Sequence, residues 1–239
     1  MKPATAVFHS AYIRGDHVAF DRYGPFTAFF SEIEKRFSGP VRILDVGCGS
    51  GHFVAECLRR GHDVWGVEID PTRADDMPPK VHERVFFQSA DQLPEFSSPF
   101  QVIAFWDSFE HFQLPFAVIE SLRKHISMDG VVFMRVNNTR DIFNWVSLAL
   151  LRFLPSLGRP LFKACYSLPE HFWNFSLGTM SQLCEKSEWR IERFRATETP
   201  ALRFTNNLAA RGAIEAAYMV NRLIGGGKIG EYWLTDDRR

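Results

Sequence analysis

Apolar residues in the first half of the chain form short continuous runs, separated by segments in which apolar positions recur at helical spacing. The runs predict strands covered on both faces, because such strands are apolar almost throughout. Strands are predicted over residues 41–46, 63–69, 84–88, 100–106 and 131–136, with a turn over 128–130 before the last. Helices are predicted over residues 16–37, 52–60 and 115–126, and a Pro- and Asp-rich loop over 70–79. This alternation indicates βαβ units and a parallel sheet.

The pattern changes after residue 137. Residues 142–154 predict a helix that is apolar on most of its surface, and Pro155, Gly158 and Pro160 then break the chain. Further helices are predicted over 180–187 and 208–224, and strands over 189–195 and, less regularly, 231–234. We expect a single domain, 1–239, made of an N-terminal helical segment (1–39), a ligand-binding core (40–139), an apolar cap insertion (140–175) and a C-terminal part (176–239).

The composition fits a globular α/β protein. Of 239 residues, 46% are hydrophobic, enough for a large core. Lys and Arg number 28 and so do Asp and Glu, so no basic surface argues for a nucleic-acid partner. The 4 cysteines form no C-x-x-C pair and no cluster of metal ligands, as expected of reduced thiols in a cytoplasmic protein. Residues 1–14 lack the apolar core of a signal peptide.

A turn with three glycines at alternate positions (Gly47, Gly49 and Gly51) follows the first strand and leads directly into a helix. Open α/β sheets bind ligands at this place, beside bare backbone N–H groups and a helix N-terminus. The dinucleotide fingerprint G-x-G-x-x-G would need a glycine at position 52, where His52 stands. Asp45, two positions before the first glycine, suits a ligand that carries a positive charge.

Acidic residues follow the next two strands. Glu68 ends the second strand, where a carboxylate can accept hydrogen bonds from both hydroxyls of a ribose, although an uninvolved surface carboxylate is the alternative. Asp70, just before a proline, is typical of a turn or helix cap. Asp91 and Gln92 follow the third strand.

The run D-x-G-x-G-x-G from Asp45 to Gly51 resembles motif I of the class I S-adenosylmethionine (SAM) methyltransferases. The order of the later features is similar to that family over about residues 40–195. The resemblance implies a Rossmann-like, doubly wound, mostly parallel seven-stranded sheet with helices on both faces, to which a helical cap is added here. It implies SAM as cofactor, with Asp91 on the adenine amino group and the backbone N–H of Gln92 on a ring nitrogen. The residues it assigns to SAM are Asp45, Gly47, Cys48, Gly49, Gly51, Phe53, Glu68, Ile69, Asp91, Gln92, Trp106 and Asp107.

The segment Phe105–Phe112 resembles the segment ending in Glu-His of a branch that includes the ubiquinone-pathway O-methyltransferases, where it lies near the methyl group. His111 can act as general base on a hydroxyl, because histidine is the residue type that exchanges protons near neutral pH. Alternatively, Glu110 and His111 only cap and orient the next helix. Asp107, Glu110 and His111 can also hold a divalent ion, as a similar set does in some relatives, but we predict no metal site.

The segment Ser167–Ser176 looks like the family's H-x-x-x-F-S segment. This likeness makes His171 a second candidate catalytic residue, on the substrate side; the alternative is that His171 is purely structural. Ser176 is predicted to be a helix N-cap.

We expect methyl transfer to a small-molecule acceptor, most simply a hydroxyl group, held under an apolar lid. The apolar segment 142–166 can instead lie on a membrane surface and reach a lipid acceptor, because Arg140, Arg152, Arg159 and Lys163 flank it. A SAM-binding protein without activity is another alternative, and an NAD-dependent oxidoreductase is disfavoured by His52. The sequence does not indicate an oligomeric state.

Overall fold

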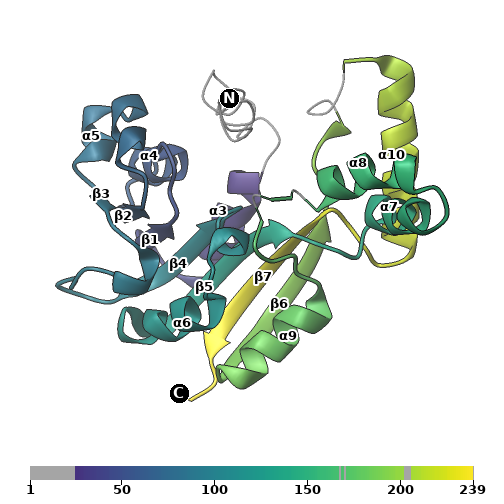
Figure 1. The fold of residues 1–239 in the computed structure, drawn as a ribbon. Helices are drawn as coiled ribbons and strands as arrows, with labels where there is room; N and C mark the ends of the chain where they lie inside the picture. The colour runs from purple at the N-terminus through teal and green to yellow at the C-terminus, as the bar shows by residue number, and fades with distance from the viewer. Residues whose placement is uncertain (1–24, 167, 170, 202–205, 239) are drawn as a thin grey trace. The chain divides into compact units, whose positions relative to one another are not determined.

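The structure is a computed structural model that describes residues 25–166, 168–169, 171–201 and 206–238 (Figure 1). Residues 16–24 of the helix predicted over 16–37 lie outside this part. In it, seven strands form one sheet in the order β3-β2-β1-β4-β5-β7-β6. The chain divides into two compact units, residues 1–105 with 121–131 and residues 106–120 with 132–239. The single domain expected from the sequence stays a prediction.

The first unit contains the parallel strands. β1 (Arg42–Val46) pairs with β2 (Asp63–Glu68) and β4 (Phe100–Trp106), and β2 pairs with β3 (Val85–Phe87). Its helical elements are α3 (Pro25–Arg36), α4 (His52–Arg59), η1 (Pro71–Asp76), α5 (Pro79–His82), η2 (Ala90–Gln92) and η4 (Leu122–Lys124).

The predicted apolar face of the first helix is confirmed in α3. Phe26, Phe29, Phe30 and Ile33 are buried. The rings of Phe29 and Phe30 lie 5.2 and 5.8 Å from the ring of Phe53 in α4. Since burial of one such side chain contributes about 1.5–3 kcal/mol, this aromatic cluster holds α3 on the helix that follows the glycine turn.

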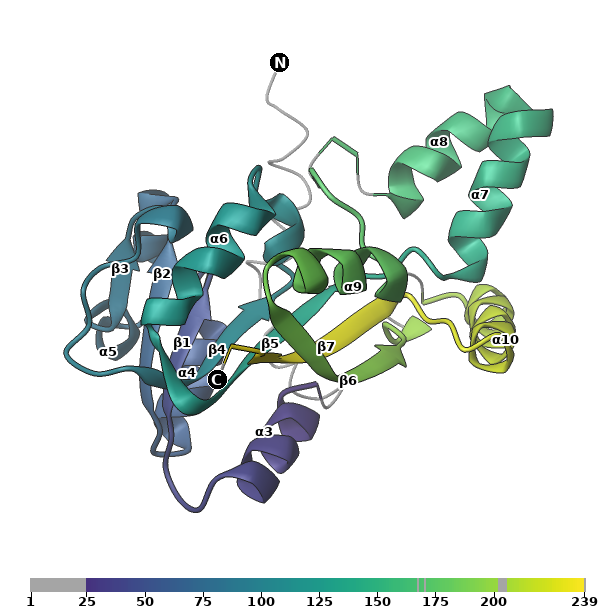
Figure 2. The ribbon, with the colours of Figure 1, turned by 90° about the horizontal axis from the view of Figure 1, so that it is seen from below.

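The second unit contains the antiparallel part of the sheet. β5 (Ile126–Asn137) begins in the first unit and continues here, and β7 (Ile229–Asp236) pairs with it on one side and with β6 (Trp189–Thr197) on the other. The helical elements are η3 (Phe109–His111), α6 (Pro115–Ser121), α7 (Ile142–Phe153), α8 (Pro155–Cys165), α9 (Leu177–Lys186) and α10 (Leu208–Leu223). Figure 2 shows α9 lying across β6, and the predicted cap at Ser176 is confirmed by a capping box with Thr179.

Three expectations about the ends of elements are wrong. The last strand is longer than the expected residues 231–234: β7 has 8 residues and two hydrogen-bonded neighbours, and Tyr232 and Leu234 are fully buried. The turn expected over 128–130 is part of β5, since Gly130 does not take the left-handed conformation. The helix expected to reach residue 126 ends at Ser121 and is followed by η4.

Proline and glycine misled the prediction in two other places. Pro155 is the first residue of α8, where no intrahelical N–H is needed, and Pro160 lies within a helix that continues to Cys165. Gly158 lets α8 approach α7, because a Cβ there would lie 2.1 Å from the backbone N of Leu151. The loop expected over 70–79 contains η1 and part of α5, and Asp70 caps η1 as predicted, by accepting the Thr72 N–H at 3.0 Å.

The four cysteines differ in burial. Cys48, Cys57 and Cys184 are buried and Cys165 is half-buried, all without a disulfide.

Candidate active site

The glycine turn after β1 needs its glycines for their backbone conformation. Gly47, Gly49 and Gly51 have φ values of 76°, 55° and 75°, in the left-handed region that other residues enter only at a cost. The N–H groups of Gly47 and Cys48 donate to the carbonyl oxygen of Val67 at 2.8 and 3.1 Å. The turn is therefore fixed to β2 before α4 begins at His52.

Two of the glycines face different surroundings. Among the residues that the structure describes, a Cβ on Gly49 would meet nothing within 4 Å, whereas a Cβ on Gly51 would lie 2.3 Å from Cγ1 of Val81 in α5. Gly51 is thus required by packing within the protein. Gly49 leaves open space beside the turn, where a ligand can approach the backbone.

Glu68 lies against this turn, at the end of β2. Its Oε2 accepts the N–H of Gly49 at 2.9 Å, and its Oε1 accepts the N–H of Asp70 at 2.9 Å. Both carboxylate oxygens keep a further lone pair, since an ionised carboxylate offers about four acceptor sites. The geometry therefore leaves Glu68 able to accept from the two hydroxyls of a ribose.

Asp45 is a buried carboxyl group within β1. It is 1% exposed, and its Oδ1 has no hydrogen-bond partner among the described residues. Burial, and then the charge of Glu68, raise the pKa of Asp45 well above its usual value. A cationic ligand group nearby would favour the ionised form and offset this cost, which fits the positive charge expected from the sequence.

The other predicted cofactor-binding residues of the first unit differ in which of their atoms a ligand could reach. The Phe53 side chain points into the aromatic cluster with α3, so only its backbone, near the start of α4, is available to a ligand. Cys48 is buried, and Ile69 is 70% exposed just past Glu68. Asp91 and Gln92 are exposed in η2, directly after β3, and the Gln92 carbonyl accepts from the side chain of Gln88.

In the second unit, Asp107 is held by a buried arginine. Its carboxylate forms an ion pair with Arg135, and its N–H donates to the carbonyl oxygen of Arg135 at 2.8 Å. Asp107 has a φ of 49°, which costs a non-glycine residue about 1–2 kcal/mol. Trp106, the last residue of β4, packs its ring 4.8 Å from Phe133. The turn after β4 thus stores strain, a feature that gathers at functional sites.

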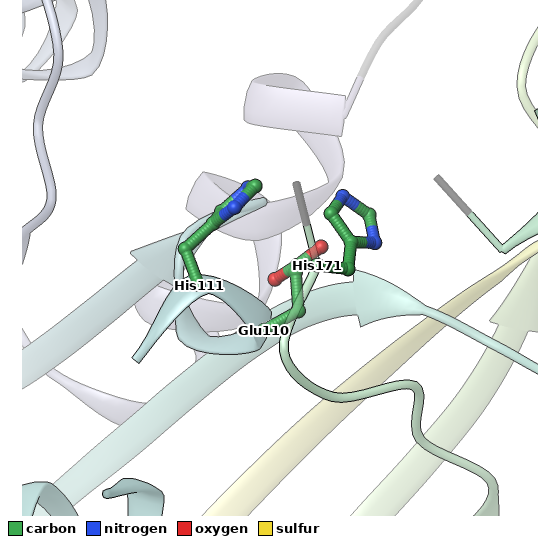
Figure 3. A group of neighbouring side chains, drawn as sticks. All are labelled: Glu110, His111 and His171. Atoms are coloured by element: carbon green, nitrogen blue, oxygen red, sulfur yellow. The ribbon is translucent and has the colours of Figure 1, made fainter. Parts of the chain in front are cut away.

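Glu110, His111 and His171 form a cluster that we call the Glu-His-His group (Figure 3). Their nearest ligand atoms all lie within 4.8 Å of one another, and the two imidazole rings meet edge to face with centroids 4.7 Å apart. The carbonyl oxygen of Glu110 accepts the N–H groups of Phe172 and Trp173 at 3.1 and 3.2 Å. These two bonds tie the segment that carries His171 to η3, which carries the other two residues.

Burial sets the protonation of this group. Glu110 is 2% exposed, and its Oε2 has no hydrogen-bond partner in the part of the chain that the structure describes. Burial, and then the charge of Asp107, raise the pKa of Glu110 to about 8. Burial, and then His111, lower the pKa of His171 to about 4. Near neutral pH the group therefore holds a protonated carboxyl and a neutral His171 imidazole.

Such a group can accept a proton from a hydroxyl, or its nitrogen and oxygen atoms can ligate a divalent ion. The sequence suggested Asp107, Glu110 and His111 as the possible ligands of an ion. In the structure the group that could hold an ion is Glu110, His111 and His171, because Asp107 pairs with Arg135.

Sequence reasoning missed two residues of this region. Arg135 forms the ion pair with Asp107. Asn137 contacts both Glu110 and His171: its N–H donates to Oε1 of Glu110 at 3.4 Å, and its Nδ2 lies 3.2 Å from Nδ1 of His171. The sequence contains one indication of Arg135: it is the charged residue in the otherwise apolar run Val131–Val136.

Known proteins provide an independent comparison. A family model described as a methyltransferase domain matches residues 16–193. The magnesium-protoporphyrin O-methyltransferase of Rhodobacter capsulatus is 32% identical over 78 residues, 31% of this chain and 35% of that protein. The ubiquinone biosynthesis O-methyltransferase of Xylella fastidiosa (strain M23) is 29% identical over 119 residues, 46% of this chain and 48% of that protein. The chain thus matches less than half the length of these two relatives.

Solved structures share the fold. A SAM-dependent methyltransferase from Archaeoglobus fulgidus superposes with a TM-score of 0.63 at 17% identity, covering 95% of this chain and 97% of that one. The plantazolicin methyltransferase BpumL, solved with S-adenosylhomocysteine, gives 0.63 at 16% identity, covering 99% and 91%. The predicted Rossmann-like, mostly parallel seven-stranded sheet is confirmed.

Proposed function

The chain belongs to the class I SAM-dependent methyltransferases, and we propose that it transfers the methyl group of SAM to a hydroxyl group of a small molecule. The observation that carries this proposal is the glycine turn: Gly49 borders open space, while Glu68 accepts its N–H and lies at the end of the neighbouring strand. A turn built in this way lets one ligand approach the backbone at Gly49 and presents a fixed carboxylate to it.

The residues around the turn account for the recognition of SAM. Asp45 is a buried carboxyl group that the cationic part of the cofactor would favour in its ionised form, and Glu68 accepts from the ribose hydroxyls. Asp91 and the backbone N–H of Gln92 are assigned to the adenine. Bound SAM supplies an activated methyl group on its sulfonium, so the protein mainly aligns the acceptor, excludes water and removes a proton.

The Glu-His-His group is assigned to the acceptor. A hydroxyl must lose its proton as the new C–O bond forms, and a neutral imidazole can take it. We assign that step to His111, with His171 beside it on the substrate side. An oxygen acceptor is supported by the names of two relatives, both O-methyltransferases. At the end of β4, residues Trp106–Phe109 also do not match the N-P-P-Y-like motif of enzymes that methylate amide nitrogens.

Titration calorimetry with SAM, S-adenosylhomocysteine and NAD tests the cofactor assignment. We expect SAM and S-adenosylhomocysteine to bind in the micromolar range and NAD not to bind. Binding of NAD without binding of SAM would overturn the proposal.

A coupled assay for S-adenosylhomocysteine release, run over phenols, aliphatic alcohols and carbon acids, tests the acceptor. Turnover only with carbon acids would refute the hydroxyl assignment, and tight SAM binding without turnover on any class would favour a non-catalytic role. Each assay is repeated with EDTA. If His111 acts as a base, the chelator leaves turnover unchanged. A loss that a divalent cation restores would assign the Glu-His-His group to a metal instead.

A further inference from the structure

The helices α7 and α8 pack against each other as a hairpin, and α7 also contacts α10 (Figure 1). The hairpin has its polar side inside. The buried residues of α7 are Asn144 and Ser147, and the buried residue of α8 is Gly158. Six large apolar side chains are exposed instead, reaching 74% at Phe153 and 61% at Leu157; the others are Trp145, Val146, Leu148 and Leu154. The remaining large apolar side chains of the two helices are half-buried: Ile142, Phe143, Leu150, Leu151, Leu161 and Phe162.

Hydrogen bonds of the polar side chains at the start of α7 fix this orientation. The side chain of Asn144 donates to the carbonyl oxygen of Asn138 at 3.1 Å, and Ser147 donates to the carbonyl oxygen of Asn144 at 2.7 Å. At the start of α7, Asn221 of α10 accepts the Ile142 N–H at 2.7 Å and donates to the buried Asp141, also at 2.7 Å. Rotating α7 to bury its apolar side would break the bonds to Asn138 and Asn221, and each buried group left unpaired costs about 1–3 kcal/mol. The apolar side therefore remains turned outward.

The charges around the exposed apolar side chains have one sign. Arg140, Arg152, Arg159 and Lys163 lie within residues 140–166, and the acidic residue in that range, Asp141, is fully buried. A second copy of the chain would bring the same cations to the interface, since both partners of a two-fold dimer use the same surface. Anionic lipid headgroups complement an apolar, cationic surface instead, and amphipathic elements with this pattern bind in the plane of the bilayer interface.

We propose that the α7–α8 hairpin docks on a membrane surface that contains anionic lipids. Phe153, Leu154 and Leu157 enter the boundary between headgroups and acyl chains, while Arg152, Arg159 and Lys163 contact the headgroups. Within the described chain no helix is long and apolar enough to cross a bilayer, so the contact is peripheral. The inference goes beyond the proposed function and does not depend on it, because it stands on the hairpin alone.

Vesicle flotation tests the proposal. Wild-type protein is mixed with vesicles of phosphatidylcholine plus phosphatidylglycerol, or of phosphatidylcholine alone. We expect it to float with the anionic vesicles, and the bound fraction to fall as salt is raised. The variant with Phe153→Ser and Leu157→Ser should lose flotation. The variant with Arg152→Gln, Arg159→Gln and Lys163→Gln should weaken binding about fivefold per cation removed.

A control variant, Met128→Ser, removes an equally exposed apolar side chain outside the hairpin (80% exposed) and should float like wild type. All variants should keep the SAM affinity and thermal midpoint of wild type, because the altered side chains are exposed. Absence of flotation with anionic vesicles, or flotation unchanged in both hairpin variants, would overturn the proposal. A dimer in light scattering that the Phe153→Ser and Leu157→Ser variant dissociates would assign the surface to a second copy instead and overturn it too.

Discussion

Replacing Gly49 and Gly51 one at a time by alanine separates a ligand-binding role from a packing role within one turn. Both residues have left-handed backbone, with φ values of 55° and 75°. They differ in the space that a Cβ would enter. No atom of the described part of the chain would lie within 4 Å of a Cβ on Gly49, whereas Cγ1 of Val81 would lie 2.3 Å from a Cβ on Gly51. The same substitution should therefore act on binding at one position and on stability at the other.

The magnitudes follow from these surroundings. An alanine in the left-handed region costs about 1–2 kcal/mol, so Gly49→Ala should lower the thermal midpoint by roughly 2–8 °C. Gly51→Ala adds overpacking against Val81, worth about 1–3 kcal/mol, and should be destabilised about twice as much. At Gly49 the new methyl group projects into the open space where SAM would contact the backbone. Loss of one hydrogen bond to a charged ligand group costs about 1.5–3 kcal/mol, so affinity should fall about tenfold to a hundredfold.

Calorimetric titration with SAM, below the thermal midpoint of each variant, measures affinity, and circular dichroism measures the midpoint. Gly51→Ala serves as the matched control: once folded, it should bind SAM more tightly than Gly49→Ala does. The reasoning is refuted if Gly49→Ala binds SAM like wild type, because the open space beside Gly49 would then not be the cofactor site. It is also refuted if the two variants lose equal stability.

Two further predictions concern the Glu-His-His group. His111→Ala should slow turnover by about 10²–10⁴-fold while SAM affinity stays near wild type, as steady-state kinetics and calorimetry will show; unchanged turnover would make His111 a structural residue. Burial raises the pKa of Glu110 to about 8, so the folded state keeps a proton that the unfolded chain loses near its usual value of about 4.3. The contribution of this proton to the free energy of unfolding is at its maximum below the unfolded pKa of about 4.3, and it is lost as the pH rises through the folded pKa of about 8. His171 acts in the opposite direction below about pH 6.5, because its folded pKa is lowered to about 4. His171 titrates in both wild type and Glu110→Gln, so its effect cancels when the two are compared. The thermal midpoint of wild type should therefore fall relative to that of Glu110→Gln between about pH 4.3 and 8; parallel curves over that range would contradict the buried state of Glu110.

Local chemistry explains which predictions of the fold succeeded. β4 has the predicted bounds, Phe100–Trp106, because an apolar run broken only by Gln101 lies between Pro99 and Asp107 and leaves little choice of ends. The predictions failed at proline and glycine residues, whose tendency to end helices and strands was outweighed by their contacts in the folded protein. Pro155, Gly158 and Gly130 suggested breaks, yet they lie at a helix start, at a helix–helix contact and within a strand.

The sequence by itself determined the glycine turn and the order of acidic residues that follow the first strands. These features are local: left-handed backbone requires glycine, and the residue at the end of a parallel strand lies at the ligand-binding edge whatever else the chain does. The tertiary structure alone decided that Arg135 holds Asp107 and that two hydrogen bonds to the Glu110 carbonyl bring His171 to His111. It also decided that α7 turns its apolar side outward, because partners distant in sequence, above all Asn221, bond its polar residues. A sequence pattern shows which side chains are apolar, but hydrogen-bond partners far along the chain decide which of them are buried.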